Sequence, residues 1–225
     1  MSESSSVFDM IGPVMIGPSS SHTAGVVRIA RVAVKILGDV PDEAEITFYN
    51  SFARTFEGHG SDRAAIAGLL DFNTDDVKIR DSFNFASKRG LKYVFKSVGN
   101  ASTFHPNTLQ IVISKGDDKV EIIGESRGGG VIRIVEVNEF NANFSASLHT
   151  VIINSKDVKG SIAYIANILS NDNCNIASMT VSRRGKNHQA CLIIETDSGI
   201  RDLTLKYLKS LDWIFSVTYI PVVEL

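Results

Sequence analysis

The chain has 225 residues, 44% of them hydrophobic and 21% charged, an ordinary composition for one or two globular domains whose core needs neither a metal nor a disulfide. The formal net charge is −2 and lysines and arginines form no block, so nucleic acid and membrane surfaces are disfavoured as partners. The first residues carry neither a basic segment nor a long apolar run, and we expect a soluble, cytoplasmic protein.

The cysteine content argues against a metal centre built by this chain alone. Only Cys174 and Cys191 are present, and their spacing fits neither a disulfide framework nor a closed metal site. We therefore expect no metal ligands in this chain. Any cofactor bound through cysteine must be held by another chain.

An amphipathic helix is predicted over residues 22–37. Apolar residues recur there at helical spacing, while Arg28, Arg31 and Lys35 fall toward the other side, and Gly38 ends the helix. Hydroxyl residues stand where the helix begins, a position at which they satisfy free backbone N–H groups. They are Ser19, Ser20, Ser21 and Thr23.

A strand and a second helix follow. The alternation over residues 45–50 predicts the strand, and residues 61–72 predict the helix, with Ser61 as its N-cap. His59, like His22, therefore stands just ahead of a helix N-terminus.

Four further strands are predicted before residue 141, each rich in β-branched and aromatic residues. They cover residues 92–98, 108–115, 119–126 and 131–140. The acidic turn between the second and third of these strands predicts a hairpin. The three consecutive glycines at residues 128–130 indicate a bulge or a wide turn.

The pattern changes after residue 140. Residues 141–147 are small and polar and indicate a linker, and the segments beyond it follow the order βαββαβ of a ferredoxin-like domain. We therefore expect an α+β chain with one domain over residues 1–147 and a second over residues 148–225.

The hydroxyl residues around His22 indicate an anion site. A helix N-terminus carries partial positive charge and free N–H donors, so a loop of small hydroxyl residues leading into it suits a carboxylate or a phosphate. The alternative is that one serine caps the helix and the others are solvated.

His59 lies between two glycines, which allow the backbone to approach a ligand closely, and Asp62 and Arg63 follow at the start of the helix. Histidine is the usual proton carrier near neutral pH, and the carboxylate of Asp62 is expected to orient its ring. The alternative is a surface histidine in a glycine turn. His105 and Asn107 stand in a His-Pro-Asn segment that suits either binding of a carboxylate or amino group or an ordinary turn.

Together these segments resemble a known family over essentially the whole chain. The segments SVFDMIGPVMIGPSSSHTAG, EGHGSDRA, HPNT and ESRGGG, followed by the ferredoxin-like tail, resemble the beta subunit of the iron-sulfur-dependent, two-chain bacterial L-serine dehydratase. The resemblance implies conversion of L-serine to pyruvate and ammonia, with a [4Fe–4S] cluster on a partner alpha subunit. It also implies that residues 1–147 are related to the allosteric substrate-binding domain of some D-3-phosphoglycerate dehydrogenases and that the tail is an ACT domain.

The resemblance also implies roles for individual residues. His59 and His22 are expected to carry a proton or orient the substrate hydroxyl. The residues expected to bind substrate are Ser19, Ser20, Ser21, Thr23, Asp62, Arg63, His105 and Asn107. In the tail, the loop that holds Asp157 and Gly160 is expected to bind an amino-acid effector, unless the tail serves only for self-association through its sheet edges.

A different class of function suits the same residues. A regulatory subunit that senses serine or another anion, without chemistry of its own, would also need hydroxyl groups and histidines at helix N-termini. The absence of an attached dehydrogenase domain in this sequence favours the catalytic interpretation.

Overall fold

The computed structural model describes residues 14–101 and 103–224, so the motif residues 6–13 used for the resemblance lie outside the described part. The chain divides into two compact units, the second of which spans Phe140–Val223. The domain boundary expected between residues 147 and 148 remains a prediction. None of the described helices combines the length and the apolar character needed to cross a lipid bilayer.

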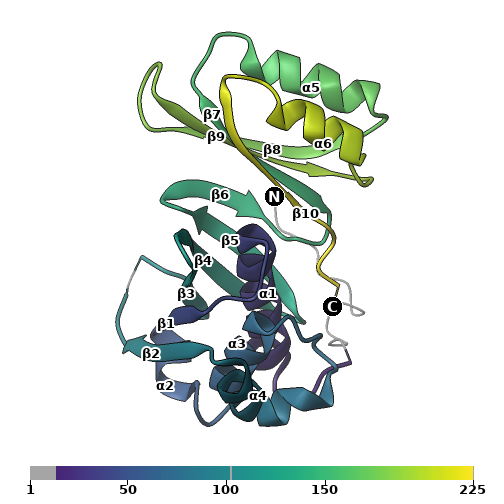
Figure 1. Cartoon of the computed structure of the whole chain (residues 1–225). Helices are drawn as coiled ribbons and strands as arrows, with labels where there is room; N and C mark the ends of the chain where they lie inside the picture. Colours follow the sequence, from purple (N-terminus) through teal and green to yellow (C-terminus); the bar gives the residue numbers. More distant parts are fainter. Residues whose placement is uncertain (1–13, 102, 225) are drawn as a thin grey trace. The chain divides into compact units, whose positions relative to one another are not determined.

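The first unit is a mixed sheet with helices packed on it (Figure 1). Its elements are η2 (a π-helical turn, Ser20–Ala24), α1 (Gly25–Leu37), β1 (Glu43–Tyr49), α2 (Asn50–Thr55), α3 (Ser61–Leu69), η3 (a 3-10 turn, Val77–Asp81), α4 (Ser82–Arg89), β2 (Lys92–Val98), β3 (Thr108–Lys115), β4 (Asp118–Gly128) and β5 (Val131–Val137). The strands lie in the order β2-β1-β3-β4-β5, and β1 pairs with β2 in parallel while the other neighbours are antiparallel. Helix α1 packs on β3, β4 and β5, and α3 packs on α1.

The predicted strands of this unit and the hairpin between β3 and β4 are confirmed, except that the strand predicted over residues 131–140 ends at Val137. The first predicted helix is confirmed from Gly25 to Leu37 and ends at Gly38, which has a φ of 88°. The placement of Arg28 on the polar side of this helix was wrong. Its side chain is fully buried, and its guanidinium donates a hydrogen bond of 2.7 Å to the carbonyl oxygen of Gly130. Periodicity did not reveal this position because the acceptor lies 102 residues further along the chain.

The second predicted helix is shorter than expected, and its N-cap is Gly60, with a φ of 70°. The assignment of Ser61 as N-cap was wrong, because Ser61 is the first helical residue and its buried hydroxyl finds no hydrogen-bond partner in the described part of the chain. The short helices α2 and α4 were not predicted. A helix of six or eight residues is too short for apolar periodicity to identify it.

The second unit has the expected ferredoxin-like order. Its elements are β6 (Phe140–Phe144), β7 (His149–Lys156), α5 (Ser161–Asn171), β8 (Ile176–Arg183), β9 (Gln189–Thr196), α6 (Asp202–Lys209) and β10 (Ile214–Ile220). The strands β10-β7-β9-β8 form an antiparallel sheet, and α5 and α6 lie on the same side of it (Figure 1). Apolar side chains of that sheet and of both helices form one core, which includes Val151, Ile165, Leu192 and Leu208.

The linker predicted over residues 141–147 was wrong in its first part, where β6 continues to Phe144. Phe140, Ala142 and Phe144 are buried in alternation with exposed asparagines, which is the pattern of a strand with one face in a core. Strand β6 contacts β8 and β9 within the unit. Its five residues and small central alanine give an apolar signal too weak to distinguish from a loop.

The contact between α1 and α3 depends on a residue without a side chain. A Cβ atom on Gly68 of α3 would lie 2.4 Å from the carbonyl oxygen of Val27 in α1 and 2.6 Å from the Cβ of Ala30. The carbonyl oxygen belongs to the backbone of a helix and cannot rotate away. The two helices therefore approach as closely as their backbones allow.

We expect Gly68→Ala to lower the free energy of unfolding by about 1–3 kcal/mol, the usual range for overpacking, even though alanine is the better helix former. Urea unfolding followed by circular dichroism measures this effect. The control is Gly99→Ala, where no atom lies within 4 Å of the added Cβ and stability should change little. A Gly68→Ala protein as stable as the parent would show that the two helices can separate without cost.

Candidate functional site

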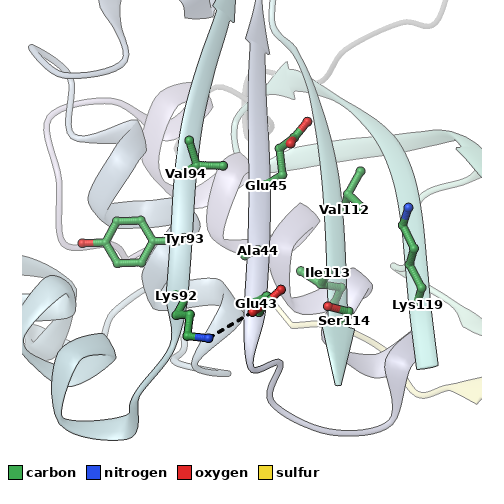
Figure 2. A pocket seen from close by; sticks show the side chains of 10 residues that line it. All are labelled: Glu43, Ala44, Glu45, Lys92, Tyr93, Val94, Val112, Ile113, Ser114 and Lys119. Atoms are coloured by element: carbon green, nitrogen blue, oxygen red, sulfur yellow. Dashed lines mark hydrogen bonds and ion pairs between the residues drawn. The ribbon is translucent and has the colours of Figure 1, made fainter. Parts of the chain in front are cut away.

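One pocket of about 380 Å³ lies over strands β2, β1, β3 and β4 (Figure 2). It contains the apolar side chains of Val94 and Val112 and an ion pair in which Nζ of Lys92 lies 3.2 Å from Oε1 of Glu43. No residue predicted from the sequence for the site lines this pocket. The described residues that line it include no histidine and no cysteine.

His22 lies in the π-helical turn η2 and is held at both ring nitrogens. Nδ1 lies 3.3 Å from the hydroxyl of Ser19, and Nε2 lies 3.1 Å from the hydroxyl of Thr55. The Ser19 hydroxyl also accepts a hydrogen bond from the backbone N–H of His22, and it lies 3.4 Å from the hydroxyl of Ser21. Ser19 and Ser21 thus belong to a hydrogen-bonded network that ends at the His22 ring.

His59 lies against His22. The two ring centroids are 4.7 Å apart with an angle of 32° between the ring planes, and Nδ1 of His59 lies 3.2 Å from the carbonyl oxygen of Thr55. The side chain of His59 is exposed. The structure therefore brings together the two histidines that the sequence placed ahead of two different helices.

Burial lowers the pKa of His22, and the neighbouring His59 lowers it further because two positive charges would repel at this distance. His22 is therefore neutral near pH 7. Its ring can then form a hydrogen-bond donor at one nitrogen and an acceptor at the other.

The lowered pKa of His22 makes stability depend on pH. The unfolded chain binds a proton at His22 near pH 6.5 more readily than the folded chain does, so the free energy of unfolding falls as pH drops through that range. His105 contributes in the same direction, since its pKa is also lowered. We expect His22→Gln to reduce the loss of stability between about pH 7.5 and about pH 5.5, measured by urea unfolding at both values. Equal losses in the parent and the variant would contradict this assignment.

Thr23, Arg63 and Arg80 line a second pocket, of about 440 Å³. Thr23 is 1% exposed, and its hydroxyl has no hydrogen-bond partner among the described residues. Two guanidinium-bearing residues, Arg63 and Arg80, supply positive charge. The pocket is lined by Met15, Ile16, Gly17, Pro18, Thr23, Gly60, Arg63, Ile79 and Arg80. Its charge and its unpaired hydroxyl suit a small anion such as a carboxylate.

Asp62 does not orient His59, contrary to our expectation. Its carboxylate accepts a hydrogen bond of 2.7 Å from the backbone N–H of Arg63, while the ring of His59 bonds to Thr55. Burial raises the pKa of Asp62. The guanidinium of Arg63 donates to the carbonyl oxygen of Arg80 and lies 5.4 Å from the ring centroid of Phe83, so the first turn of α3 is tied to η3 and α4.

The loop that carries His105 and Asn107 is held by Asn50, the first residue of α2. The Asn50 amide donates to the carbonyl oxygens of Ala101 and Phe104 at 2.9 and 3.1 Å, and its own side-chain oxygen accepts from the N–H of Ala101 at 2.7 Å. The backbone of Asn50 has a φ of 50°, a conformation that asparagine tolerates better than most residues. The N–H of the following residue, Ser51, donates to the carbonyl oxygen of Pro106.

Removing the Asn50 side chain should therefore loosen the His-Pro-Asn loop. We expect Asn50→Gly, which keeps the backbone conformation, to lower the free energy of unfolding by about 1–3 kcal/mol through lost hydrogen bonds. Asn50→Ala should cost about 1 kcal/mol more, because alanine is strained at positive φ. Chemical denaturation of the three proteins measures both steps. A glycine variant with parental stability would mean that these hydrogen bonds contribute nothing.

His105 and Asn107 lie beside β4 rather than against the histidine pair. Nδ1 of His105 accepts a hydrogen bond of 3.2 Å from the backbone N–H of Asn107, and the carbonyl oxygen of Asn107 accepts from the N–H of Ser126. Burial lowers the pKa of His105, and the positive charge of Arg127 lowers it further. No described contact joins the side chains of His105 or Asn107 to His22 or His59. Helix α2 connects the His-Pro-Asn loop and the histidine pair, because its first residues contact the loop and its last residue contacts the two histidines.

The described residues do not fit an iron–sulfur cluster. No group of three or more histidine, cysteine, aspartate or glutamate side chains in the described part of the chain lies close enough to hold a metal ion. Both cysteines are buried, and burial raises the pKa of the Cys191 thiol to about 11, whereas cluster ligands are thiolates. We therefore assign no metal-dependent step to this chain.

In the second unit, the expected effector loop lies between β7 and α5. Gly160, with a φ of 84°, is the N-cap of α5. The Asp157 carboxylate accepts hydrogen bonds from Arg183 at 3.4 Å and from the backbone N–H of Asn187 at 3.0 Å. Asp157 thus joins its loop to the β8–β9 hairpin.

The fold and the site define a class of protein: an α+β chain in which a unit with paired histidines and a pocket lined by two arginines precedes a ferredoxin-like βαββαβ unit. The family described as serine dehydratase beta chain matches residues 6–90. A probable L-serine dehydratase beta chain from Bacillus subtilis (strain 168) is 44% identical over 215 residues, which cover 96% of this chain and 97% of the relative. An L-serine dehydratase beta chain from Peptoniphilus asaccharolyticus is 34% identical, covering 96% of this chain and 98% of the relative. The chain belongs to the serine dehydratase beta chain family.

A second similarity is more distant. A D-3-phosphoglycerate dehydrogenase from Bacillus subtilis (strain 168) is 26% identical over 159 residues, which cover 70% of this chain and 30% of the relative. The predicted family and fold class are confirmed: the chain belongs to the serine dehydratase beta chain family, and a mixed α+β unit precedes a ferredoxin-like unit of the order expected for an ACT domain.

Sequence reasoning missed three residues that build the site. Thr55 contacts both histidines, Asn50 holds the His-Pro-Asn loop, and Arg80 lines the anion pocket. Asparagine directly after the strand β1 was a usable signal, because asparagine is common where the chain takes a positive φ. Thr55 and Arg80 carried no such signal.

Proposed function

We propose that this chain is the beta subunit of an L-serine dehydratase, a lyase that converts L-serine to pyruvate and ammonia and is active only together with an alpha subunit. The observation that carries the proposal is the exposed ring of His59. Its Nδ1 is bonded to a carbonyl oxygen, which accepts but cannot donate, so Nδ1 carries the hydrogen and a neutral His59 has its lone pair on Nε2. That nitrogen can accept a proton from a substrate bound at the surface of this unit.

In the proposed reaction, His59 removes the proton from Cα of L-serine. The Cα–H bond breaks and its electron pair forms the Cα–Cβ double bond, while the Cβ–O bond breaks and the departing hydroxyl takes up one proton, balancing the one that His59 accepted, to leave as water. The resulting aminoacrylate gains a proton at Cβ and loses one from its nitrogen to form an imine, and water hydrolyses the imine to pyruvate and ammonia. The family resemblance implies a [4Fe–4S] cluster, and the described residues of this chain do not fit one. We therefore propose that the alpha subunit holds the cluster and assists the departure of the hydroxyl.

The substrate carboxylate is assigned to the pocket beside Thr23. Arg63 and Arg80 supply positive charge there, and the unpaired Thr23 hydroxyl supplies a donor. The ring of His22 lies beside the ring of His59, at a centroid distance of 4.7 Å. The family of this chain and the names of its relatives support the same substrate.

Replacing the proposed proton acceptor tests the reaction. With the alpha subunit co-expressed under anaerobic conditions, we expect His59→Ala to lower kcat for pyruvate formation by about 100-fold or more, the usual contribution of general acid–base catalysis. The variant Thr23→Val serves as the contrast and should mainly raise KM, since loss of a donor to the substrate carboxylate weakens binding of the ground and transition states alike. The two subunits must co-purify in the parental ratio in every case. An assembled His59→Ala enzyme with parental kcat would remove the proton-acceptor role.

A second candidate function is an anion-sensing regulatory subunit without chemistry of its own. The two arginines and the unpaired hydroxyl in one pocket favour it, because they suit an anion whether or not a reaction follows. The same His59→Ala enzyme separates the two functions. Parental kcat in that fully assembled enzyme would favour sensing.

We also propose that the second unit self-associates through a sheet edge. Strand β10 lies at one edge of its sheet, and Phe215 on it is 61% exposed. Exposed edges of this kind commonly pair with another copy. We expect Phe215→Asp to lower the molar mass measured by light scattering, while Leu203→Asp on α6, where the leucine is 77% exposed, should not. An unchanged mass for Phe215→Asp would place the association elsewhere.

A further inference from the structure

Thr55 contacts both histidines of the site through two different atoms, and these contacts determine where each ring carries its hydrogen. We propose that Thr55 is a positioning residue that fixes His22 as the Nε2–H tautomer and His59 as the Nδ1–H tautomer. The two tautomers are assigned from the hydrogen bonds of Thr55 alone. The consequence of these tautomers for catalysis rests on the proposed function.

The hydroxyl group of Thr55 determines the tautomer of His22. It donates its single hydrogen to the carbonyl oxygen of Ser51, one turn earlier in α2, at 2.9 Å. The contact of 3.1 Å between the same hydroxyl oxygen and Nε2 of His22 therefore requires that Nε2 is the donor. The lone pair of the neutral ring is then on Nδ1, where the Ser19 hydroxyl lies 3.3 Å away and can donate.

The carbonyl group of Thr55 determines the tautomer of His59. A carbonyl oxygen only accepts, so Nδ1 of His59, 3.2 Å away, carries a hydrogen. The same oxygen accepts the backbone N–H of His59 at 3.0 Å. Histidine free in water favours the other tautomer, with the hydrogen on Nε2. The bond to Thr55 therefore leaves on Nε2 the lone pair that a proton acceptor needs.

The position of Thr55 is itself fixed by α2. The first turn of this helix is anchored by the Asn50 side chain and by the bond from the Ser51 N–H to the carbonyl oxygen of Pro106. The ring of Phe52, fully buried, lies edge-on to His22 with a centroid distance of 4.9 Å. Thr55 thus presents its two acceptor atoms from a backbone that is held at the other end of the helix.

The decisive variants separate the hydroxyl from the carbonyl. Thr55→Val keeps the shape of the side chain, the β-branching and the carbonyl, and removes only the hydroxyl. Thr55→Ser keeps the hydroxyl. The inference predicts that the valine variant releases His22 from its tautomer while His59 keeps its own, and that the serine variant behaves as the parent does.

Nitrogen NMR of the full-length chain, labelled with ¹⁵N in histidine rings, measures both tautomers without an alpha subunit and without catalysis. The ring signals are assigned by single replacement of each of the five histidines with glutamine. At a pH where the rings are neutral, we expect Nε2 of His22 and Nδ1 of His59 to show the shifts of protonated ring nitrogens. In Thr55→Val the His22 shifts should move toward the average of two tautomers, and in Thr55→Ser they should return to the parental values.

Two results would overturn the proposal. One is a parent protein in which His59 carries its hydrogen on Nε2, and the other is a Thr55→Val protein whose His22 shifts equal those of the parent. Activity of the assembled enzyme tests the separate claim about catalysis. Thr55→Val should lower kcat about tenfold with little change in KM, the factor that corresponds to loss of one neutral hydrogen bond, and Thr55→Ser should restore it. If the NMR shifts agree and kcat does not change, the tautomers stand and the tautomer of His22 has no influence on catalysis.

Discussion

The close approach of α1 and α3 is the constraint on which the rest of the first unit depends. Where Gly68 meets the backbone of Val27, no side chain separates the two helices. His22 belongs to the turn that precedes α1, and His59 belongs to the loop that precedes α3. A fixed packing of the two helices therefore holds the two loops in place, so that the centroids of the histidine rings lie 4.7 Å apart although 36 residues separate the two histidines in the sequence. The geometry of the histidine pair therefore depends on the same helix packing that forms the core of the unit.

Helix α2 links the loops of the site through hydrogen bonds. It has only six residues, too few to be stable by itself, and it gains its stability from contacts at both ends. Asn50 and Ser51 bind the His-Pro-Asn loop at one end, and Thr55 binds the two histidines at the other. Three motifs that lie far apart in the sequence are thereby tied to a single turn and a half of helix. The polar groups of α2 are satisfied by the loops that surround it, and those loops are ordered by the same bonds.

The sequence was sufficient for the features that follow a repeating pattern. The strands of the first unit, the long helix α1 and the βαββαβ order of the second unit each have a periodicity or an order that is visible without coordinates. The features that it could not give depend on contacts between distant residues. Arg28 looked polar because its acceptor, Gly130, lies far along the chain, and Asp62 looked like the partner of His59 because it is near in sequence. Thr55, the actual partner, is equally near, but a threonine has no charge that would single it out.

The buried guanidinium of Arg28 has a consequence for the three glycines at residues 128–130. Burial lowers the pKa of Arg28 to about 10, yet the side chain remains a cation near neutral pH, and a buried cation deprived of an acceptor is costly. The carbonyl oxygen of Gly130 supplies one such acceptor at 2.7 Å. Any motion that moves this turn away from α1 must break the hydrogen bond between the buried, positively charged Arg28 and the carbonyl oxygen of Gly130. Glycine-rich turns are usually the most pliable parts of a surface, but here the turn is electrostatically tethered to the core, and its flexibility is limited by a charge that lies beneath it.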